Sequence, residues 1–523
     1  MDCGGVHSAC RRLNWFTNYS TSLTCIDGAL TDSNTDSDLT RLFSDDRADF
    51  ARLGKRTIDA LSNYLSDLPD EAVERVVPDA QRRFLSTLEM PSRGMSADDI
   101  ITFMEQQILP WPQATGHQRS FGWVNSPPMP VSVLAESVAQ TMNAALDGYD
   151  FSGIFLMVSL GRWLRDLAGF PEGDESMALL FSGGSAANLN ALTTARHAAA
   201  KQDGWNVRGE GLQGKRPAMI AYASDQVHSS VQRCIEQLGL GGDNLRKVPT
   251  DASFRMDAAA LKQMIAADRT AGLRPFAVIA SAGTTNTGAI DPLDAIADVC
   301  EDAGAWFHVD GAYGGFGGLD PDYSDSYASI GRADTLTIDP HKWLHVPIDC
   351  GALLTRRKSM HREAFSLTPA YLEAGAGDSA PWPYEYMFQL TYANRALKTW
   401  AALARMGKSG VRDLIIRCNR LATLLDKYVA EAHDLEILSP TSLSVVNFRY
   451  VPEGRDLEHK ELDDLNQRIS DAVSASGEAH IPTTRVNGQL SLRACILHYE
   501  NDEADIHHLV ELVRRLGAEL APL

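Results

Sequence analysis

The 523-residue sequence contains no apolar run that approaches the roughly 20 residues needed to cross a bilayer. Its first residues include Arg11, Arg12, Asn14 and Asn18, and they lack the apolar stretch of a secretory signal peptide. We therefore expect neither a membrane span nor export, and we predict a cytoplasmic protein.

The sequence also lacks an excess of positive charge. Its 48 basic residues face 68 acidic ones, which gives a formal net charge of -20. Such a chain is poorly suited to wrapping nucleic acid or lying on an anionic membrane. The eight cysteines are scattered without the paired spacing of metal ligands, so we expect reduced thiols and no bound metal.

The length favours one large domain with smaller appendages. Residues 1–46 are rich in Ser, Thr, Asp and Asn without periodicity, which predicts a poorly structured extension. Residues 47–129 have a helical pattern and predict a small N-terminal domain. We expect the large domain over 130–397 and a small α+β domain over 398–523.

Short apolar segments alternate with helical ones in the middle of the chain. Strands are expected at 177–181, 218–223, 276–281, 306–309, 335–338 and 352–354. This alternation predicts a mostly parallel sheet that is covered on both faces. Ligands of such sheets bind beyond the carboxyl ends of the strands, so the residues that follow each strand are the candidates for a site.

A glycine-rich segment, Phe-Ser-Gly-Gly-Ser-Ala-Ala-Asn-Leu over residues 181–189, follows the first of these strands. Gly183 and Gly184 let backbone N–H groups approach an anion, and the next helix directs its positive end to the same place. A phosphate would fit there. A tight turn capped by Ser185 is the alternative. The absence of Gly-x-Gly-x-x-Gly, and of a closing Lys-Ser/Thr pair, argues against dinucleotide and P-loop sites.

Three further polar residues follow strands. His228, near a helix start, is placed either to stack on a flat cofactor and exchange protons or simply to cap the helix. Thr285 lies in a small-residue stretch that either lines the same pocket or only turns the chain. Asp310 ends a buried strand, where its carboxylate needs a partner such as a protonated pyridine nitrogen or the backbone amides of a structural cap.

Lys342 lies in the segment Asp-Pro-His-Lys-Trp over residues 339–343, at the end of a short apolar strand. The apolar neighbours Trp343, Leu344 and Val346 favour the neutral amine that forms Schiff bases with carbonyl groups. A solvated surface lysine is the alternative. In chain order, an anion loop, a histidine, a threonine, an aspartate and a lysine are the parts of a pyridoxal phosphate site.

These segments, residues 339–343 above all, resemble the group II pyridoxal-phosphate-dependent amino acid decarboxylases, the family of aromatic amino acid, glutamate and histidine decarboxylases. The resemblance runs from about Gly116 to the C-terminus. It implies the α/β type I pyridoxal phosphate fold, like that of aspartate aminotransferase, with a mostly parallel sheet in the large domain. It also implies a homodimer with shared active sites, in which the helical N-terminal segment packs on the partner subunit.

Carried over by motif position, the resemblance assigns a role to each cofactor-side residue. It implies that Gly184 and Ser185 bind the phosphate, with Asp339 and His341 nearby. The residues implied to contact the ring are Thr285, Asp310, Ala312 and His228. Lys342 is implied to form the internal aldimine. Residues 368–372 resemble the mobile catalytic loop of the family. They place Tyr371 as the proton donor, reaching into the neighbouring subunit's site.

The implied reaction is decarboxylation of an L-amino acid to its amine and CO2. Some relatives with phenylalanine at the position of Tyr371 instead release an aldehyde by oxidative deamination, so Tyr371 and His228 favour simple decarboxylation. A non-catalytic binding protein on the same fold is disfavoured because no cofactor-side position is lost.

The substrate is less clearly indicated. Residues 117–126 resemble the substrate side of the family and place Trp123, Val124 and Ser126 along the pocket, where an aromatic, apolar wall suits an aromatic amino acid. Core packing explains Trp123 equally well. Phe155 and Met157 stand where many aromatic amino acid decarboxylases carry two glutamates, so an acidic or other non-aromatic amino acid remains an alternative substrate.

Overall fold

The computed structural model describes residues 35–144, 151–214, 216–367, 382–455 and 457–521. The chain divides into two compact units. The first comprises residues 1–66 and 80–110, and the second comprises residues 67–79 and 111–523. None of the helices in these described ranges is both long enough and apolar enough to cross a membrane.

The first unit is helical. It contains α1 (Thr35–Asp67), most of α2 (Asp79–Ser86), α3 (Ala97–Phe103) and a π-helical turn over Met104–Ile108. The side chain of Ser96 caps α3 by accepting from the N–H of Asp99, and Arg56 of α1 pairs with Glu105 at 2.6 Å. Helix α1 begins at Thr35, inside the segment predicted to be an unstructured extension. Acidic and hydroxyl side chains are favourable in the first turns of a helix, and their abundance there was misinterpreted as a sign of disorder.

The second unit contains a seven-stranded sheet in the order β1-β7-β6-β5-β4-β2-β3. Strand β7 is antiparallel to both of its neighbours, and the other pairs are parallel. The mostly parallel sheet is thus confirmed. The strands are β1 (Met177–Phe181), β2 (Met219–Ser224), β3 (Leu245–Val248), β4 (Arg274–Ser281), β5 (Trp306–Asp310), β6 (Thr335–Ile338) and β7 (Gly351–Thr355).

Strand β3 was missed by the sequence analysis. It lies at one edge of the sheet, and its central residues, Arg246 and Lys247, are charged. Charged side chains protect an exposed sheet edge from unwanted pairing, and they also remove the apolar run by which a strand is identified in a sequence.

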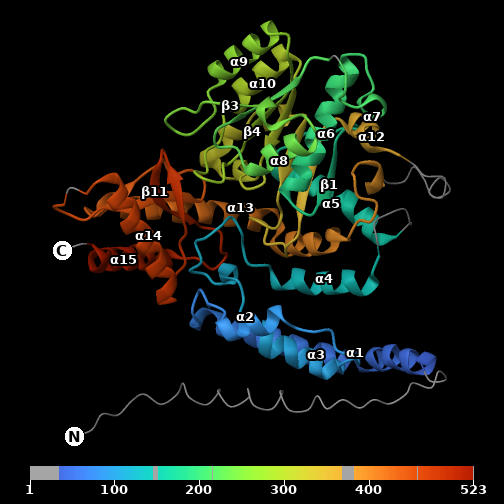
Figure 1. Ribbon diagram of the computed structural model, residues 1–523, viewed down its shortest axis with the longest axis vertical. Helices are drawn as coiled ribbons and strands as arrows, with labels where there is room; N and C mark the ends of the chain where they lie inside the picture. Colours follow the sequence, from blue (N-terminus) through green and yellow to red (C-terminus); the bar gives the residue numbers. More distant parts are fainter. Residues whose placement is uncertain (1–34, 145–150, 215, 368–381, 456, 522–523) are drawn as a thin grey trace. The chain divides into compact units, whose positions relative to one another are not determined.

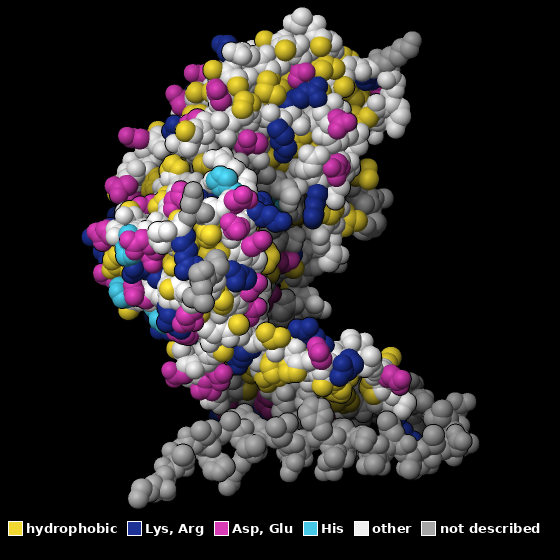
Figure 2. Space-filling view, turned by 60° about the vertical axis from the view of Figure 1, so that its left-hand side comes forward, with side chains coloured by type: hydrophobic (Ala, Val, Ile, Leu, Met, Phe, Trp, Pro, Cys, Tyr) yellow, Lys and Arg dark blue, Asp and Glu magenta, His cyan; other side chains and the backbone are white. Residues whose placement is uncertain are grey.

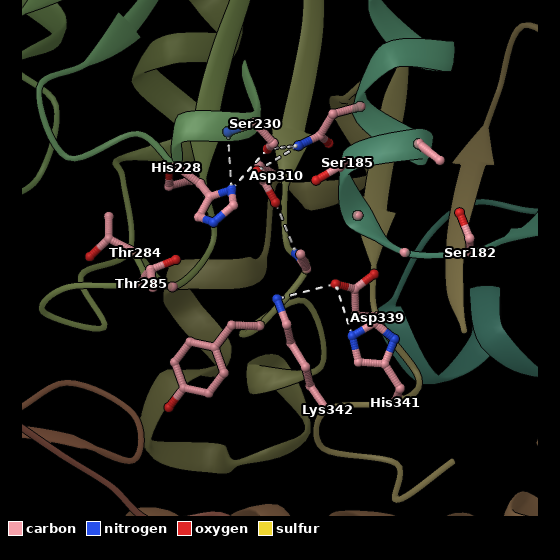
Figure 3. Close-up of a pocket in the computed structure, with 18 residues that line it drawn as sticks. Ser182, Ser185, His228, Ser230, Thr284, Thr285, Asp310, Asp339, His341 and Lys342 are labelled. Carbon is pink, nitrogen blue, oxygen red and sulfur yellow. Dashed lines mark hydrogen bonds and ion pairs between the residues drawn. The ribbon is translucent and has the colours of Figure 1, made fainter. Parts of the chain in front are cut away.

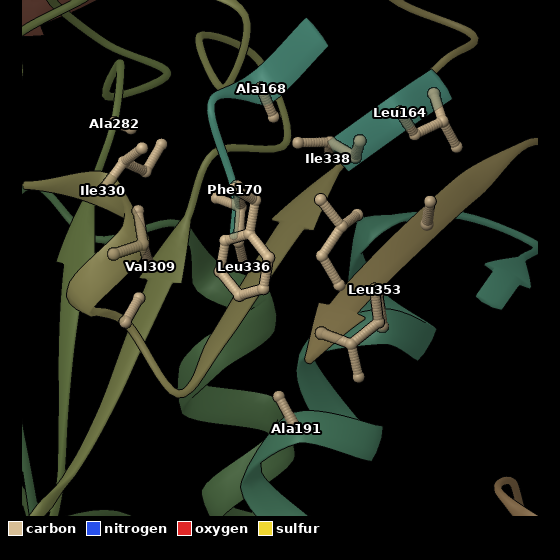
Figure 4. Packing of buried hydrophobic residues seen from close by; sticks show 14 of the residues in the cluster. Leu164, Ala168, Phe170, Ala191, Ala282, Val309, Ile330, Leu336, Ile338 and Leu353 are labelled. Atoms are coloured by element: carbon tan, nitrogen blue, oxygen red, sulfur yellow. The ribbon is translucent and has the colours of Figure 1, made fainter. Parts of the chain in front are cut away.

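Helices cover both faces of this sheet. Figure 4 shows Leu164 and Ala168 of α5 (Ser152–Ala168) on one side of the strands and Ala191 of α6 (Gly184–Gln202) on the other. These side chains belong to one core together with Leu336, Ile338 and Leu353 of β6 and β7. Strands buried on both faces form continuous apolar segments, which is why six of the seven could be predicted.

A second, antiparallel sheet with the order β10-β11-β9-β8 lies towards the C-terminus. Its strands are β8 (Leu435–Ile437), β9 (Val445–Tyr450), β10 (Thr483–Val486) and β11 (Gln489–Cys495), with α14 (His459–Ser476) and α15 (Glu503–Leu520) alongside.

On the face shown in Figure 2, acidic and basic side chains are intermixed, and Arg515 and Glu478 form one of the C-terminal ion pairs at 2.8 Å.

The long helix α13 (Arg395–Glu431) connects the two sheets and bends at Gly407, whose φ of 66° is left-handed. It packs against α4 (Pro130–Met142) and α5 on one side and against α15 and the second sheet on the other (Figure 1). The predicted domain limit at 397/398 falls in the first turn of α13.

Candidate active site

The segments that follow β1, β2, β4, β5 and β6 meet beyond the carboxyl ends of these strands, because the five strands run in the same direction. They surround a cavity of about 310 Å³ (Figure 3). All nine predicted cofactor-side residues line it, namely Gly184, Ser185, His228, Thr285, Asp310, Ala312, Asp339, His341 and Lys342. Elements that are far apart in the sequence thus converge on a single site.

One wall of the cavity is the start of α6. A Cβ atom on Gly184 would lie 3.0 Å from Oδ2 of Asp339 and 3.1 Å from Cβ of Ala312, so a side chain at this position would be tightly confined. The helix that begins there directs its free N–H groups and its positive end into the cavity. This wall is suited to an anion.

Lys342 enters the cavity after β6. Its Nζ lies 3.1 Å from Oδ2 of the buried Asp339. His341 lies 3.7 Å from the same oxygen, and burial lowers the pKa of its imidazole. Its Nδ1 accepts a hydrogen bond from the N–H of Cys350 at 3.1 Å, so the proton of the neutral ring is on Nε2. The second oxygen of Asp339 has no hydrogen-bond partner among the described residues.

Asp310 is held at the end of β5 by two donors. Its Oδ2 accepts from Nδ2 of Asn188 at 2.9 Å, and its Oδ1 accepts from the N–H of Ala312 at 3.1 Å. The two donors fix the orientation of this buried carboxylate. The site therefore contains a negative charge in a fixed orientation.

His228 is both the N-cap of α8 (Ser229–Gln237) and part of the cavity wall, so the two interpretations of this residue are compatible. Its Nδ1 accepts from the N–H of Ser230 at 3.2 Å and lies 2.9 Å from the Ser230 hydroxyl. With Nδ1 occupied as an acceptor, Nε2 of the neutral ring carries the proton.

The predicted substrate-side residues lie elsewhere in this single chain. Trp123 is exposed, Val124 belongs to the main core, and the Ser126 hydroxyl donates to the backbone carbonyl of Lys342. None of the three is among the described residues that line the cavity. Tyr371 lies outside the described residues.

Several residues that line the cavity were not predicted, among them Asn188, Ser230 and Tyr313. Asn188 belongs to the glycine-rich segment 181–189, whereas Ser230 lies two residues after His228 and Tyr313 three residues after Asp310. Asn188 lies three residues after Ser185, on the same face of α6, and a buried amide on an otherwise small and apolar helix face was the signal that could have revealed it.

The side chains present fit pyridoxal phosphate. The confined space at Gly184 and the start of α6 suit its phosphate, Lys342 offers an amine, and the buried carboxylate of Asp310 suits a protonated ring nitrogen. The cavity volume lies at the lower end of the range for small-molecule sites.

Comparison with known proteins agrees with this chemistry. An aromatic-L-amino-acid decarboxylase from Bacillus atrophaeus is 30% identical over 478 residues, which cover 90% of this chain and 96% of the relative. An L-2,4-diaminobutyrate decarboxylase from Acinetobacter baumannii is 31% identical over 422 residues, which cover 78% and 81%.

Solved structures show the same fold. The structure of Oryza sativa TDC with PLP and tryptamine superposes with a TM-score of 0.84 at 23% identity, covering 94% of this chain and 100% of that one. The glutamate decarboxylase domain of diaminobutyrate-pyruvate transaminase and L-2,4-diaminobutyrate decarboxylase from Vibrio parahaemolyticus superposes with a TM-score of 0.79 at 26% identity, covering 90% of this chain and 96% of that one. The type I pyridoxal phosphate fold is thereby confirmed.

The pyridoxal-dependent decarboxylase conserved domain matches residues 78–451. With pyridoxal phosphate as its cofactor and an amino acid as its substrate, the chain belongs to the pyridoxal-dependent decarboxylase family.

Proposed function

We propose that this decarboxylase acts on an aromatic L-amino acid and releases the amine and CO2. The observation that carries the proposal is the convergence of Lys342, Asp310 and His228 on one cavity beyond the carboxyl ends of the strands. Relatives from Bacillus atrophaeus and Sus scrofa that align with 90% of this chain are named aromatic-L-amino-acid decarboxylases, which supports the choice of substrate.

The residues have distinct proposed roles. Gly184 and Ser185 hold the phosphate through the start of α6, and Lys342 attaches the cofactor through Nζ. Asp310 is proposed to pair with the protonated pyridine nitrogen, because two donors hold its carboxylate in a fixed orientation. Bound pyridoxal phosphate supplies the electron sink for the loss of CO2.

His228 is proposed to cover the ring face and to present its Nε2–H to the cavity, because its Nδ1 is already occupied as an acceptor. Thr285 and Ala312 are proposed to contact the ring, with Asp339 and His341 beside the phosphate. Tyr371 is proposed to protonate the substrate carbon, and Trp123, Val124 and Ser126 are proposed to line the substrate side once a partner subunit completes the site.

A homodimer is part of the proposal. Helix α4 carries Leu134, Val138 and Met142, spaced four residues apart on one face, and each is exposed in the single chain. Phe155 of α5, which stands where many aromatic decarboxylases have a glutamate, is exposed as well, whereas Met157 is buried. Exposed apolar side chains in a row are typical of a protein interface.

We further propose a helical domain that begins at Thr35 and ends near residue 129, a large domain over 130–397 and a small domain over 398–523. We also propose a cytoplasmic location. The division of the strands between the large sheet at 177–355 and the small sheet at 435–495 supports the last two domains.

The decisive test is a substrate panel. The purified enzyme with pyridoxal phosphate should be supplied with L-tryptophan, L-tyrosine, L-phenylalanine, L-glutamate and L-2,4-diaminobutyrate while CO2, amine and oxygen are recorded. We expect the highest kcat/KM with an aromatic substrate, equal amounts of CO2 and amine, and no oxygen uptake. Preference for glutamate or diaminobutyrate would overturn the aromatic assignment, and oxygen uptake with aldehyde release would favour oxidative deamination.

A further inference from the structure

A chain of buried polar side chains leads to Asp310 from inside the large sheet. Nε1 of Trp306 donates to Oγ1 of Thr335 at 2.9 Å, and Oγ1 of Thr335 lies 2.9 Å from Nδ1 of His308. Nε2 of His308 lies 3.1 Å from Oδ1 of Asn188, whose Nδ2 donates to Asp310. All five side chains are buried, so these contacts are shielded from water.

The carboxylate at one end, together with a neutral His308, fixes the direction of every hydrogen bond in this chain. An indole N–H can only donate and a carboxylate can only accept. The amide nitrogen of Asn188 must therefore face Asp310, which leaves its oxygen to accept from Nε2–H of His308. Nδ1 of the neutral His308 then accepts from the hydroxyl of Thr335, which in turn accepts from Trp306. Each donor points towards Asp310.

A charged His308 would instead donate from both ring nitrogens, so this arrangement requires the neutral ring. Burial lowers the pKa of His308 to about 4, while the nearby carboxylate of Asp310 acts in the opposite direction. The ring is therefore neutral near pH 7. A turned amide at Asn188 would direct its oxygen at Asp310 and its N–H₂ group at the Nε2–H of His308, and both contacts would be repulsive.

The chain branches at Asn188. The second proton of its Nδ2 is directed at Oγ of Ser230, at 3.2 Å, and that hydroxyl lies 2.9 Å from Nδ1 of His228 (Figure 3). Since Ser230 accepts from Asn188, its own proton is available for Nδ1 of His228. One amide group thus contacts the carboxylate proposed to hold the pyridine nitrogen and, through one hydroxyl, the imidazole proposed to cover the ring.

We propose that Asn188 is a positioning residue that fixes the carboxylate of Asp310 and the proton position of His228 together, and that His308 and Thr335 hold its amide in the required orientation. The inference rests on the proposed roles of Asp310 and His228. Hydrogen bonds to a charged group are about twice as strong as neutral ones, and donors arranged in series strengthen one another. Loss of Asn188 therefore loosens both groups at once.

The helix offers a matched control. Asn190 lies two residues further along α6, is equally buried, and also accepts from a buried histidine, since Nε2 of His361 contacts its Oδ1. It is not among the described residues that line the cavity. Asn190→Ala removes a comparable buried amide from the same helix without touching Asp310 or His228.

The test compares Asn188→Ala with Asn190→Ala. For Asn188→Ala we expect kcat to fall about tenfold to a hundredfold with little change in KM, the Kd for pyridoxal phosphate to rise about tenfold, and the absorption maximum of the bound cofactor to shift at constant neutral pH. For Asn190→Ala we expect a comparable loss of Tm with kcat, cofactor Kd and absorption maximum close to those of the wild type.

Asn188→Asp is the second variant, and it keeps the shape of the side chain while replacing the donor that faces Asp310 by an acceptor. We expect at least the same losses. Equal kcat and cofactor Kd for the Asn188 and Asn190 variants would overturn the inference. Cofactor affinity and absorption need no substrate, so they judge this inference even if the substrate panel contradicts the proposed reaction.

Discussion

Substitution of Gly351 by alanine should disturb the site from a position whose backbone only supports it. Gly351 begins β7 and pairs with Phe181, directly before the anion-binding turn. A Cβ atom on Gly351 would lie 2.5 Å from both Cα and the carbonyl carbon of Gly183, and 2.7 Å from Oδ1 of Asp339. Nonbonded carbon atoms are about 3.5 to 4.0 Å apart at their optimum, so the turn would have to move by about 1 Å.

The size of the effect follows from that displacement. Overpacking of this kind costs about 1 to 3 kcal/mol of folding free energy. A shift of about 1 Å in a group that positions a ligand can reduce catalysis about a hundredfold. We therefore expect Gly351→Ala to lower Tm, to weaken pyridoxal phosphate binding and to reduce kcat/KM about a hundredfold.

The assay combines thermal unfolding, cofactor titration and steady-state kinetics. Gly410→Ala is the matched control. Apart from the helix backbone, its Cβ would meet no described atom within 4 Å except Cβ of Met406 at 3.4 Å, and alanine is favoured over glycine in helices. That variant should bind cofactor normally and be slightly more stable. Wild-type cofactor affinity in Gly351→Ala would refute the argument that β7 fixes the anion-binding turn.

Three further predictions concern other residues. Asp310→Asn should reduce kcat/KM by about a hundredfold or more, because an amide turns a donor towards the N–H of Asn188 or Ala312, and unchanged kinetics would contradict the role of the charge. Burial lowers the pKa of His361 to about 4, so the unfolded chain binds more protons than the folded chain between pH 4 and about 6.5, and stability falls as the pH drops through this range. The decrease in Tm from about pH 7 to 5 should be smaller in His361→Gln, and an equal decrease would contradict the assignment. Leu134→Glu should dissociate the proposed dimer in analytical ultracentrifugation, and an unchanged mass would exclude that face of α4 as the interface.

The sequence was most informative where buried strands end in polar residues. Met177–Phe181 and Thr335–Ile338 have the predicted bounds because strands buried on both faces are apolar throughout. Asp310 and Lys342 could be predicted to lie close together because the carboxyl ends of parallel strands lie on the same side of a sheet.

Other features depend on contacts that no local pattern contains. Asn188 meets Asp310 across 122 residues of sequence, and its orientation depends on His308, whose partner Thr335 is in yet another strand. The edge strand β3 carries charges that conceal it. Trp123 is exposed in one chain, so its predicted place at the substrate side depends on a second subunit.

One measurement tests the central claim that Lys342 is the lysine that attaches the cofactor. The enzyme loaded with pyridoxal phosphate is reduced with sodium borohydride, and the modified lysine is identified by peptide mass spectrometry. Lys398, which is buried and pairs with Glu136 at 3.2 Å, serves as the internal reference. We predict the pyridoxyl group on Nζ of Lys342 and an unmodified Lys398. Modification of any other lysine, or bound cofactor without a reducible bond, would contradict the account.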